Sequence, residues 1–143
     1  MYLEDWKLHT RIPLPPVSIN KEQMFAFARQ YDPLPMHLDE EYAQNTRFGG
    51  LIVPGMMSFL TVWVEFARQN LFGEALIAGK NMSVEWHLPV YVEDVLTGTA
   101  EVTNVEKRNA YNGIVEVTVE VVNQSGEQVF TGKSESVIRC KPQ

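Results

Sequence analysis

The chain has 143 residues, of which 45% are hydrophobic and 21% are charged, and its formal net charge is −6. This length suits one domain with a buried core, which we expect to span residues 1–143. An acidic chain without a cluster of Lys and Arg is unsuited to binding nucleic acid, so that class of function is excluded.

The sequence has no feature of a secreted or membrane protein. No segment reaches the roughly 20 uncharged apolar residues of a membrane span, and the acidic first residues do not resemble a secretion signal. The single cysteine, Cys140, cannot form an internal disulfide. We therefore expect a cytoplasmic protein that does not associate with a membrane.

The first helix is predicted to follow an irregular, proline-containing lead-in of residues 1–17 that holds one short strand. Asn20 is typical of a helix N-cap, and Gln23 stands where it completes a capping box. Apolar residues then recur at the spacing of a buried helical face: Met24, Phe27, Ala28 and Tyr31. Pro33 cannot continue the helix, so the helix is expected to end at Tyr31.

The segment from Asp32 to His37 holds a carboxylate and an imidazole five residues apart, with two prolines between them. The prolines predict a stiff loop that presents its side chains. Asp and His together form a minimal pair for general acid–base catalysis. The same residues also suit a plain turn, in which Asp caps backbone amides and His is merely exposed. The six residues alone do not decide between these interpretations.

Two further helices are predicted, a short one from Asp39 to Gln44 with Asp39 as its cap, and a long one from about Met56 to Asn70. The polar residues of the long helix form one narrow stripe: Ser58, Thr61, Glu65 and Arg68. A helix that is apolar around most of its circumference must be buried on most sides. A curved sheet that wraps around the helix would bury it better than a flat one.

The second half of the chain predicts that sheet. Four segments are strand-like: 84–90, 95–106, 115–121 and 129–138. Asn112-Gly113 predicts a tight hairpin turn, and Asn123 to Gly126 predicts another. Strands joined by hairpins are antiparallel. The predicted fold class is therefore α+β, with an antiparallel sheet wrapped around a long central helix, which is the architecture of the hotdog fold.

Several motifs narrow this prediction to one branch of that fold. Asp32 to Asp39 has Asp-x4-His-x-Asp spacing, with His-Leu-Asp after a proline-containing spacer, and Gly55 opens the long helix. These residues resemble the MaoC-like dehydratases, which include the (R)-specific enoyl-CoA hydratases. Further matching segments are Phe27-Ala28, Tyr42-Ala43, Phe48-Gly49-Gly50 and the strand entry from Leu88 to Asp94. The similarity runs from about residue 18 to residue 139.

The resemblance implies a lyase that adds water to an α,β-unsaturated acyl thioester or removes it, acting on a CoA or carrier-protein thioester without a cofactor. Asp32 and His37 would hold the catalytic water, with Asp32 as the base or the two acting as a unit. Gly55 would donate its N–H to the thioester carbonyl at the start of the helix, where partial positive charge suits an enolate oxygen. The implied substrate-binding residues are Pro54, Met56, Phe59 and Trp63.

The chain also departs from the family at three positions. Pro54 stands where many relatives have Ser or His, and Trp63 stands where some hydratases have a helix Ser. Glu93 replaces the Gly that precedes Asp94 in the family pattern. Pro54 and Trp63 are expected to reshape the pocket, and with it the acyl specificity.

Two other functions fit the same fold. A hotdog thioesterase would use a helix carboxylate, here Glu65, to activate water for hydrolysis, although this residue also suits a subunit interface. A non-catalytic subunit that binds an acyl thioester is the other alternative.

Three smaller expectations concern partners and ligands. His37 and Asp39 lack the further ligands of a metal site, so no metal is expected. Lys107-Arg108 could meet a CoA phosphate, but such a pair is more common simply exposed on a hairpin. Hotdog proteins usually pair through their sheets, so the resemblance implies at least a homodimer.

Overall fold

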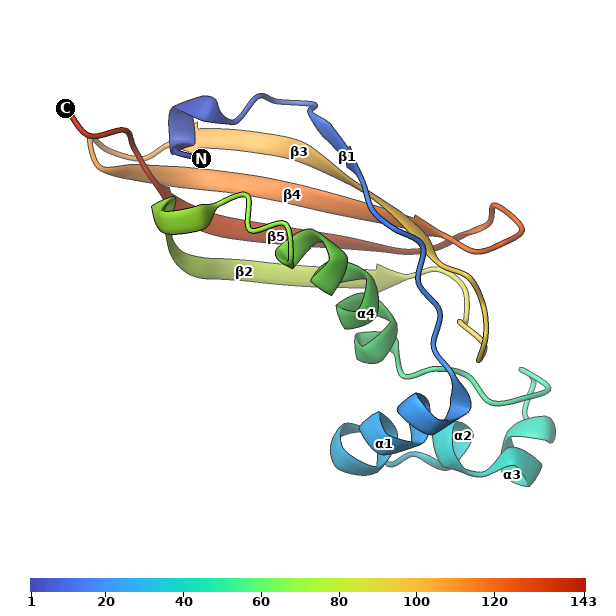
Figure 1. Ribbon diagram of the computed structural model, residues 1–143. Coiled ribbons are helices and arrows are strands. Elements are labelled where there is room, and N and C mark those ends of the chain that lie inside the picture. Colours follow the sequence, from blue (N-terminus) through green and yellow to red (C-terminus); the bar gives the residue numbers. More distant parts are fainter.

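The computed structural model describes residues 1–143 and contains one five-stranded antiparallel sheet with the order β1-β3-β4-β5-β2 (Figure 1). Its strands are β1 (Arg11–Pro13), β2 (Leu76–Trp86), β3 (Thr97–Lys107), β4 (Asn112–Val122) and β5 (Gln128–Arg139). Hairpins join β3 to β4 and β4 to β5, and β2 pairs with β5 at one edge of the sheet. The predicted antiparallel sheet is confirmed.

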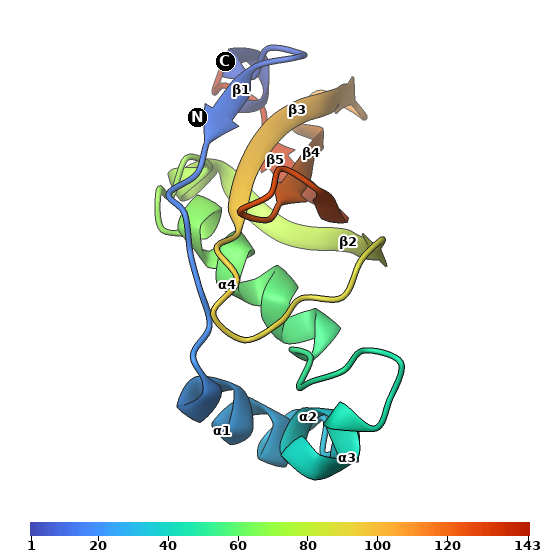
Figure 2. The ribbon, with the colours of Figure 1, turned by 90° about the vertical axis from the view of Figure 1, so that its right-hand side faces the viewer.

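The helices are α1 (Lys21–Tyr31), α2 (Pro35–Leu38), α3 (Glu40–Gln44) and α4 (Gly55–Ala67). The sheet curves around α4, as Figure 2 shows, so the predicted arrangement of a sheet wrapped around a central helix is also confirmed. Helices α1, α2 and α3 gather beyond the N-terminal end of α4, away from the sheet (Figure 1). No helix is long and apolar enough to cross a lipid bilayer.

The ends of the short helices follow local rules. The Asn20 side chain accepts a hydrogen bond from the Gln23 backbone at 2.8 Å, and the Gln23 side chain accepts one from the Asn20 backbone at 3.1 Å. Asp39 caps α3 by accepting the backbone N–H of Tyr42 at 3.0 Å. The capping box, the end of α1 at Tyr31 and the cap of α3 are confirmed predictions.

The segment between Asp32 and His37 differs from its prediction, because part of it is helical rather than a loop. Pro35 is the first residue of α2 and His37 is the third. A proline in the first turn sacrifices no helical hydrogen bond, since the N–H groups there have no partner in the helix. Pro35 therefore starts a turn of helix instead of stiffening an extended loop.

Two features of the sheet also differ from prediction. Strand β2 begins at Leu76, earlier than the alternation at 84–90 indicates. Most of its residues are exposed, so no alternation of buried and exposed residues marks its first part in the sequence. Asn112-Gly113 opens β4 instead of forming the turn. The turn is organised by Asn109, whose side chain accepts the backbone N–H of Tyr111 at 2.8 Å and of Asn112 at 2.9 Å.

The core lies between α4 and the concave face of the sheet. The helix buries one face, made of Ser58, Phe59, Val62 and Phe66. The opposite side keeps Met56 47% exposed and Leu60 43% exposed. The prediction of a helix buried on most sides is therefore not met within one chain. The helix also ends at Ala67, three residues before the predicted end.

The two ends of the chain are joined by a hydrogen bond and an ion pair between charged residues. The Lys141 backbone N–H donates to the Glu4 carboxylate at 2.9 Å, and the Lys141 ammonium lies 2.7 Å from the Asp5 carboxylate. The backbone hydrogen bond lowers the pKa of Glu4, the Lys141 side chain lowers the pKa of Asp5, and Asp5 raises the pKa of Lys141. The carboxylates therefore stabilise the fold above their ordinary pKa, and this contribution is lost as pH falls through the lowered values. Lys141 contributes below its ordinary pKa and loses this contribution as pH rises through the raised value.

We expect Lys141→Ala to lower the melting temperature by about 1–3 °C at about pH 7, because exposed ion pairs stabilise a fold only slightly. The difference from the wild type should shrink at a strongly acidic pH, because the contribution of the carboxylates is lost as the pH falls through their lowered pKa values. Lys133→Ala is the matched control, since Lys133 is exposed and belongs to no ion pair. Thermal unfolding followed by circular dichroism at both pH values tests this, and an equal loss at both would contradict it.

Candidate active site

His37 is a buried histidine held at both ring nitrogens. Its side chain is 5% exposed, its Nδ1 lies 2.7 Å from the carbonyl oxygen of Ile52, and its Nε2 lies 3.2 Å from Oδ2 of Asp32. Asp32 follows the last residue of α1, and its side chain remains 38% exposed. The structure therefore brings the two predicted catalytic side chains together, with the carboxylate open to water and the imidazole enclosed.

The contact with Ile52 determines which ring nitrogen of His37 carries a hydrogen. A carbonyl oxygen can only accept, so Nδ1 must donate. In the neutral ring, Nε2 then presents a lone pair, and an ionised carboxylate beside it has no hydrogen to offer. The contact between Nε2 and Asp32 is a hydrogen bond only when one proton lies between them, on the ring or on the carboxyl group. Such a pair can take a proton from one atom and return it to another.

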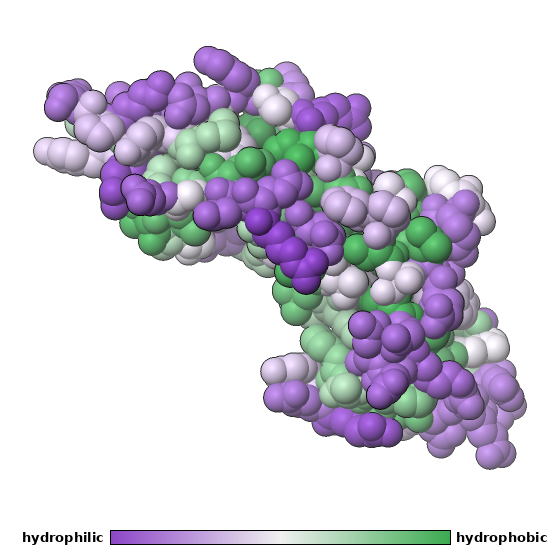
Figure 3. Space-filling view, in the orientation of Figure 1, coloured by the Kyte–Doolittle hydropathy of each residue, from purple (hydrophilic) through white to green (hydrophobic).

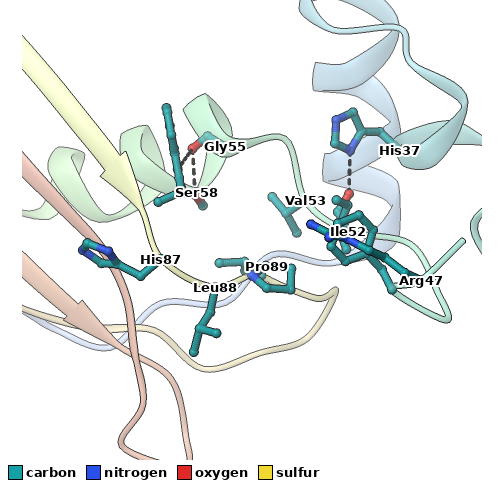
Figure 4. Close-up of a pocket in the computed structure, with 12 residues that line it drawn as sticks. His37, Arg47, Ile52, Val53, Gly55, Ser58, His87, Leu88 and Pro89 are labelled. Carbon is teal, nitrogen blue, oxygen red and sulfur yellow. Dashed lines mark hydrogen bonds between the residues drawn. The ribbon is translucent and has the colours of Figure 1, made fainter.

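Gly55 is the first residue of α4 and faces the same pocket as His37. The backbone N–H groups of Gly55, Met56 and Met57 make no hydrogen bond within the chain. Free N–H groups and the helix dipole make this end of α4 suited to an oxygen with developing negative charge. The pocket has a volume of about 340 Å³, and Figure 4 shows Gly55 and Ser58 on one side of it and His37 on the other.

Trp86, at the end of β2, fixes the backbone at Gly55. Its indole N–H donates to the Gly55 carbonyl at 3.0 Å, and the Ser58 hydroxyl donates to the same oxygen at 2.7 Å. A Cβ atom on Gly55 would lie 2.6 Å from the indole ring. In this structure the first role of Gly55 is to let Trp86 approach the helix.

The four predicted substrate-binding residues lie outside this pocket. Pro54 is buried as the N-cap of α4, and Met56 is exposed on the far side of that helix. Phe59 is buried over Gly132, where a Cβ atom would lie 2.5 Å from its ring. Trp63 stacks on Phe59 with ring centres 5.8 Å apart and lines a second cavity of about 260 Å³. Their role in binding substrate stays a prediction.

The residues weighed for other roles lie elsewhere in the fold. Glu65 is ten residues beyond Gly55 on α4, or about 15 Å along the helix axis, and its carboxylate accepts a hydrogen bond from Arg68 at 2.8 Å. Lys107 and Arg108 lie at the turn between β3 and β4, at the end of the sheet opposite α2 (Figure 1). No group of three or more His, Cys, Asp or Glu side chains is arranged to hold a metal ion.

Among the lining residues that sequence reasoning did not assign to the site are Trp86 and Arg47. Trp86 belongs to the alternating pattern that predicted a strand, but nothing local indicates that its indole reaches Gly55, 31 residues earlier. Arg47 lies between two motifs of the family pattern and matches neither. Both residues could be found only once the fold had placed them beside His37 and Gly55.

Comparison with known proteins identifies the family of the chain. A family model described as the FAS1-like dehydratase domain region matches residues 15–132. The uncharacterized protein YdeM of Bacillus subtilis is 28% identical over 140 residues, which cover 97% of this chain and 99% of YdeM. The (R)-specific enoyl-CoA hydratase of Aeromonas caviae is 31% identical over 100 residues, which cover 70% of this chain and 71% of the hydratase.

Solved structures match over nearly the whole chain. The (R)-hydratase of A. caviae superimposes with a TM-score of 0.75 at 27% identity, covering 96% of this chain and 99% of that chain. The MaoC-like dehydratase of Rhodospirillum rubrum gives a TM-score of 0.88 at 26% identity and covers 100% of this chain and 99% of its own. These similarities confirm the predicted hotdog fold and the predicted family resemblance.

Proposed function

The chain belongs to the family of MaoC-like dehydratases and (R)-specific hydratases, and we propose that it adds water reversibly to an α,β-unsaturated acyl thioester, giving the (R)-3-hydroxyacyl thioester. Residues 1–143 would act as one domain. A cytoplasmic location is part of the same proposal, in keeping with the lone Cys140.

The observation that carries this proposal is the 3.2 Å contact between the Asp32 carboxylate and the His37 ring, opposite the free N–H groups at the start of α4. The thioester carbonyl would accept the Gly55 N–H, which polarises the conjugated double bond. A water molecule held by Asp32 and His37 would then attack C3. The pair takes one proton of that water, while the π electrons move toward the carbonyl oxygen and form an enolate.

The same pair would complete the reaction. The proton taken from water returns to C2, the enolate collapses to the carbonyl, and the net change is one water added across the double bond. One acid–base pair activates the water that attacks C3 and also delivers the proton to C2. The oxygen and the proton therefore add to the same face of the substrate. This accounts for a syn addition without a cofactor.

The test is a spectrophotometric assay with crotonyl-CoA and longer enoyl-CoA thioesters, with carrier-protein thioesters as a second series. The ultraviolet absorbance of the conjugated thioester should fall as water adds, and chiral analysis of the product should give the (R)-3-hydroxy acid. Release of free thiol that depends on Glu65 would point instead to a thioesterase. Binding without turnover of any thioester in either series would favour a non-catalytic subunit.

We also propose that two copies of the chain pair along β2. This strand lies at the edge of the sheet and leaves large apolar side chains exposed: Leu76, Ile77, Met82 and Trp86. Beside it, α4 exposes Met56 and Leu60, and Figure 3 shows hydrophobic residues interspersed with hydrophilic ones where β2 and α4 lie. A long free edge that exposes large apolar side chains is a surface that natural proteins cover. A second copy would cover both the strand and the exposed side of α4.

The expected result is a particle of twice the chain mass in light scattering coupled to size exclusion. Leu60→Lys places a charge on the exposed side of α4 and should shift the protein toward the monomer. Leu8→Lys is the matched control, because Leu8 is a similarly exposed leucine far from β2 in sequence and in the sheet order. A strictly monomeric wild type would argue against pairing.

A further inference from the structure

Arg47 is the only Lys or Arg that lines the pocket with His37 and Gly55. It lies on the segment between α3 and α4, with its guanidinium over the ring of Phe48 at 5.0 Å from the ring centre. It makes no ion pair and no hydrogen bond within the chain, whereas Arg11, Lys21, Arg68 and Lys141 all face carboxylates. Figure 4 shows the Arg47 side chain extending past Ile52 into the pocket.

The rest of the pocket lining does not neutralise this charge. None of its residues is Asp or Glu, although the chain carries 18 acidic residues against 12 Lys and Arg. Its other ionisable groups are His37, whose Nε2 lies 3.2 Å from the Asp32 carboxylate, and His87, whose Nε2 lies 3.2 Å from the Thr131 hydroxyl. The Asp32 carboxylate lies beside His37, so the exposed guanidinium of Arg47 has no carboxylate partner and favours an anion at its end of the pocket.

The guanidinium is well suited to bind such an anion. Its planar fork of N–H groups matches a carboxylate or a phosphate oxygen pair. Contact with the Phe48 ring restricts the side chain through a cation–π interaction, so less conformational freedom is lost on binding. The single arginine of the pocket, which has no acidic partner of its own, thus has the features of a preorganised anion-binding group.

The order of residues along the pocket indicates which part of the substrate reaches Arg47. In Figure 4, Gly55 and Ser58 lie on one side, and His37 and Arg47 lie on the other. A thioester whose carbonyl meets Gly55 and whose C3 meets the Asp32–His37 pair continues past C3 toward Arg47. The pocket volume of about 340 Å³ is at the low end for ligand sites, so the acyl chain that fits is short.

We propose that Arg47 binds an anionic group of the thioester, a carboxylate at the end of a short acyl chain. This proposal depends on the proposed function, because the proposed reaction sets the direction in which the thioester lies in the pocket. The phosphates of CoA offer the same chemistry to a guanidinium and are the other source of an anion. The acyl carboxylate is favoured because it lies on the C3 side of the carbonyl, where Arg47 is.

Saturated thioesters test the proposal by binding alone, since they have no double bond to hydrate. Isothermal titration would compare the glutaryl and butyryl thioesters of N-acetylcysteamine, which carry no phosphate, with butyryl-CoA. The wild type should bind the glutaryl ester more tightly than the butyryl ester. Arg47→Gln should weaken binding of the glutaryl ester about 10- to 100-fold and leave that of the butyryl ester unchanged, because only the former offers a charge-assisted hydrogen bond. Arg47→Lys should restore part of the loss.

Arg29→Gln is the matched control. Arg29 also lies over an aromatic ring, 5.5 Å from the centre of Phe25, and also makes no ion pair, but it lines no pocket with His37. It should bind both esters as the wild type does. If Arg47→Gln weakens only butyryl-CoA, the anion-binding role stands and its ligand is a phosphate. If it weakens none of the three ligands, the proposal is wrong.

These outcomes are separable from those of the hydratase assay. A protein that binds the glutaryl ester through Arg47 but hydrates no enoyl thioester would refute the proposed reaction and keep the anion site. If the protein hydrates crotonyl-CoA but Arg47→Gln changes the binding of none of the three ligands, the anion site is refuted and the proposed reaction stands.

Discussion

Asp32→Asn is expected to reduce the rate of enoyl-CoA hydration by about 10²–10⁴-fold, the range typical of losing a general acid–base group. The amide keeps the size of the carboxylate but cannot take up a proton beside His37, whose Nε2 lies 3.2 Å from the wild-type side chain. The Asp32 side chain is 38% exposed, so the change should leave the fold intact. Initial rates with crotonyl-CoA, together with thermal unfolding, separate the effect on chemistry from the effect on stability.

His37→Ala should give a loss of the same size, with a smaller additional loss when both changes are combined. Two groups that act on one proton are not additive, because removing either one disables the pair. The alanine also leaves the Ile52 carbonyl without its donor, so a lower melting temperature is expected for this variant.

The control for these variants is His9→Ala. His9 is also a histidine beside a carboxylate, with its Nδ1 3.7 Å from Glu101, but its side chain is 74% exposed and lines no part of the pocket. Its rate should equal that of the wild type. Full activity in both Asp32→Asn and His37→Ala would refute the assigned roles.

Beyond the overall architecture, the details of the fold that sequence could predict are those fixed by near neighbours. The capping box of Asn20 and Gln23 and the cap at Asp39 need partners only three residues away, so their pattern is visible in the sequence. The turn between β3 and β4 was predicted at Asn112-Gly113 because that dipeptide often forms tight turns. In the structure Asn109 supplies the turn, while Gly113 allows close approach of the Glu106 carbonyl, 2.3 Å from where a Cβ atom would lie.

The contacts of the candidate site also fall into local ones, which the sequence suggests, and distant ones, which it does not. Asp32 and His37 are five residues apart, so a one-turn helix brings them together and the spacing alone suggests the pair. The partners that complete their function are distant in sequence. Ile52 fixes the ring of His37 from 15 residues away, and Trp86 holds Gly55 from 31 residues away. The first contact depends on where the segment before α4 passes α2, and the second depends on how the end of β2 packs against the start of α4, so neither is encoded in a local pattern.

Gly55→Ala is the second variant with a large expected effect. The added Cβ atom would lie 2.6 Å from the Trp86 indole, so either the ring or the first turn of α4 must move. Overpacking of this kind destabilises proteins by about 1–3 kcal/mol. The shift would also misdirect the N–H groups expected to meet the thioester oxygen. Loss of one such donor lowers kcat by about 10²–10³-fold.

A second substitution can separate the steric clash with Trp86 from the loss of correctly placed N–H groups at the start of α4. In Gly55→Ala with Trp86→Ala, the clash is removed, so the melting temperature should recover part of its loss. Catalysis should stay low, because the Gly55 carbonyl has then lost the indole donor at 3.0 Å that helps to hold the peptide in place. Trp86→Phe alone keeps most of the ring and removes only that donor, and it should lower kcat more than it raises KM.

Gly50→Ala is the matched control for Gly55→Ala, because a Cβ atom there meets nothing within 4 Å and the backbone is not in the left-handed region. It should behave as the wild type in both melting temperature and kcat. A Gly55→Ala protein that is equally unchanged would mean that Trp86 moves aside freely. In that case the start of α4 would not be held by the indole, and the reason given for glycine at this position would be wrong.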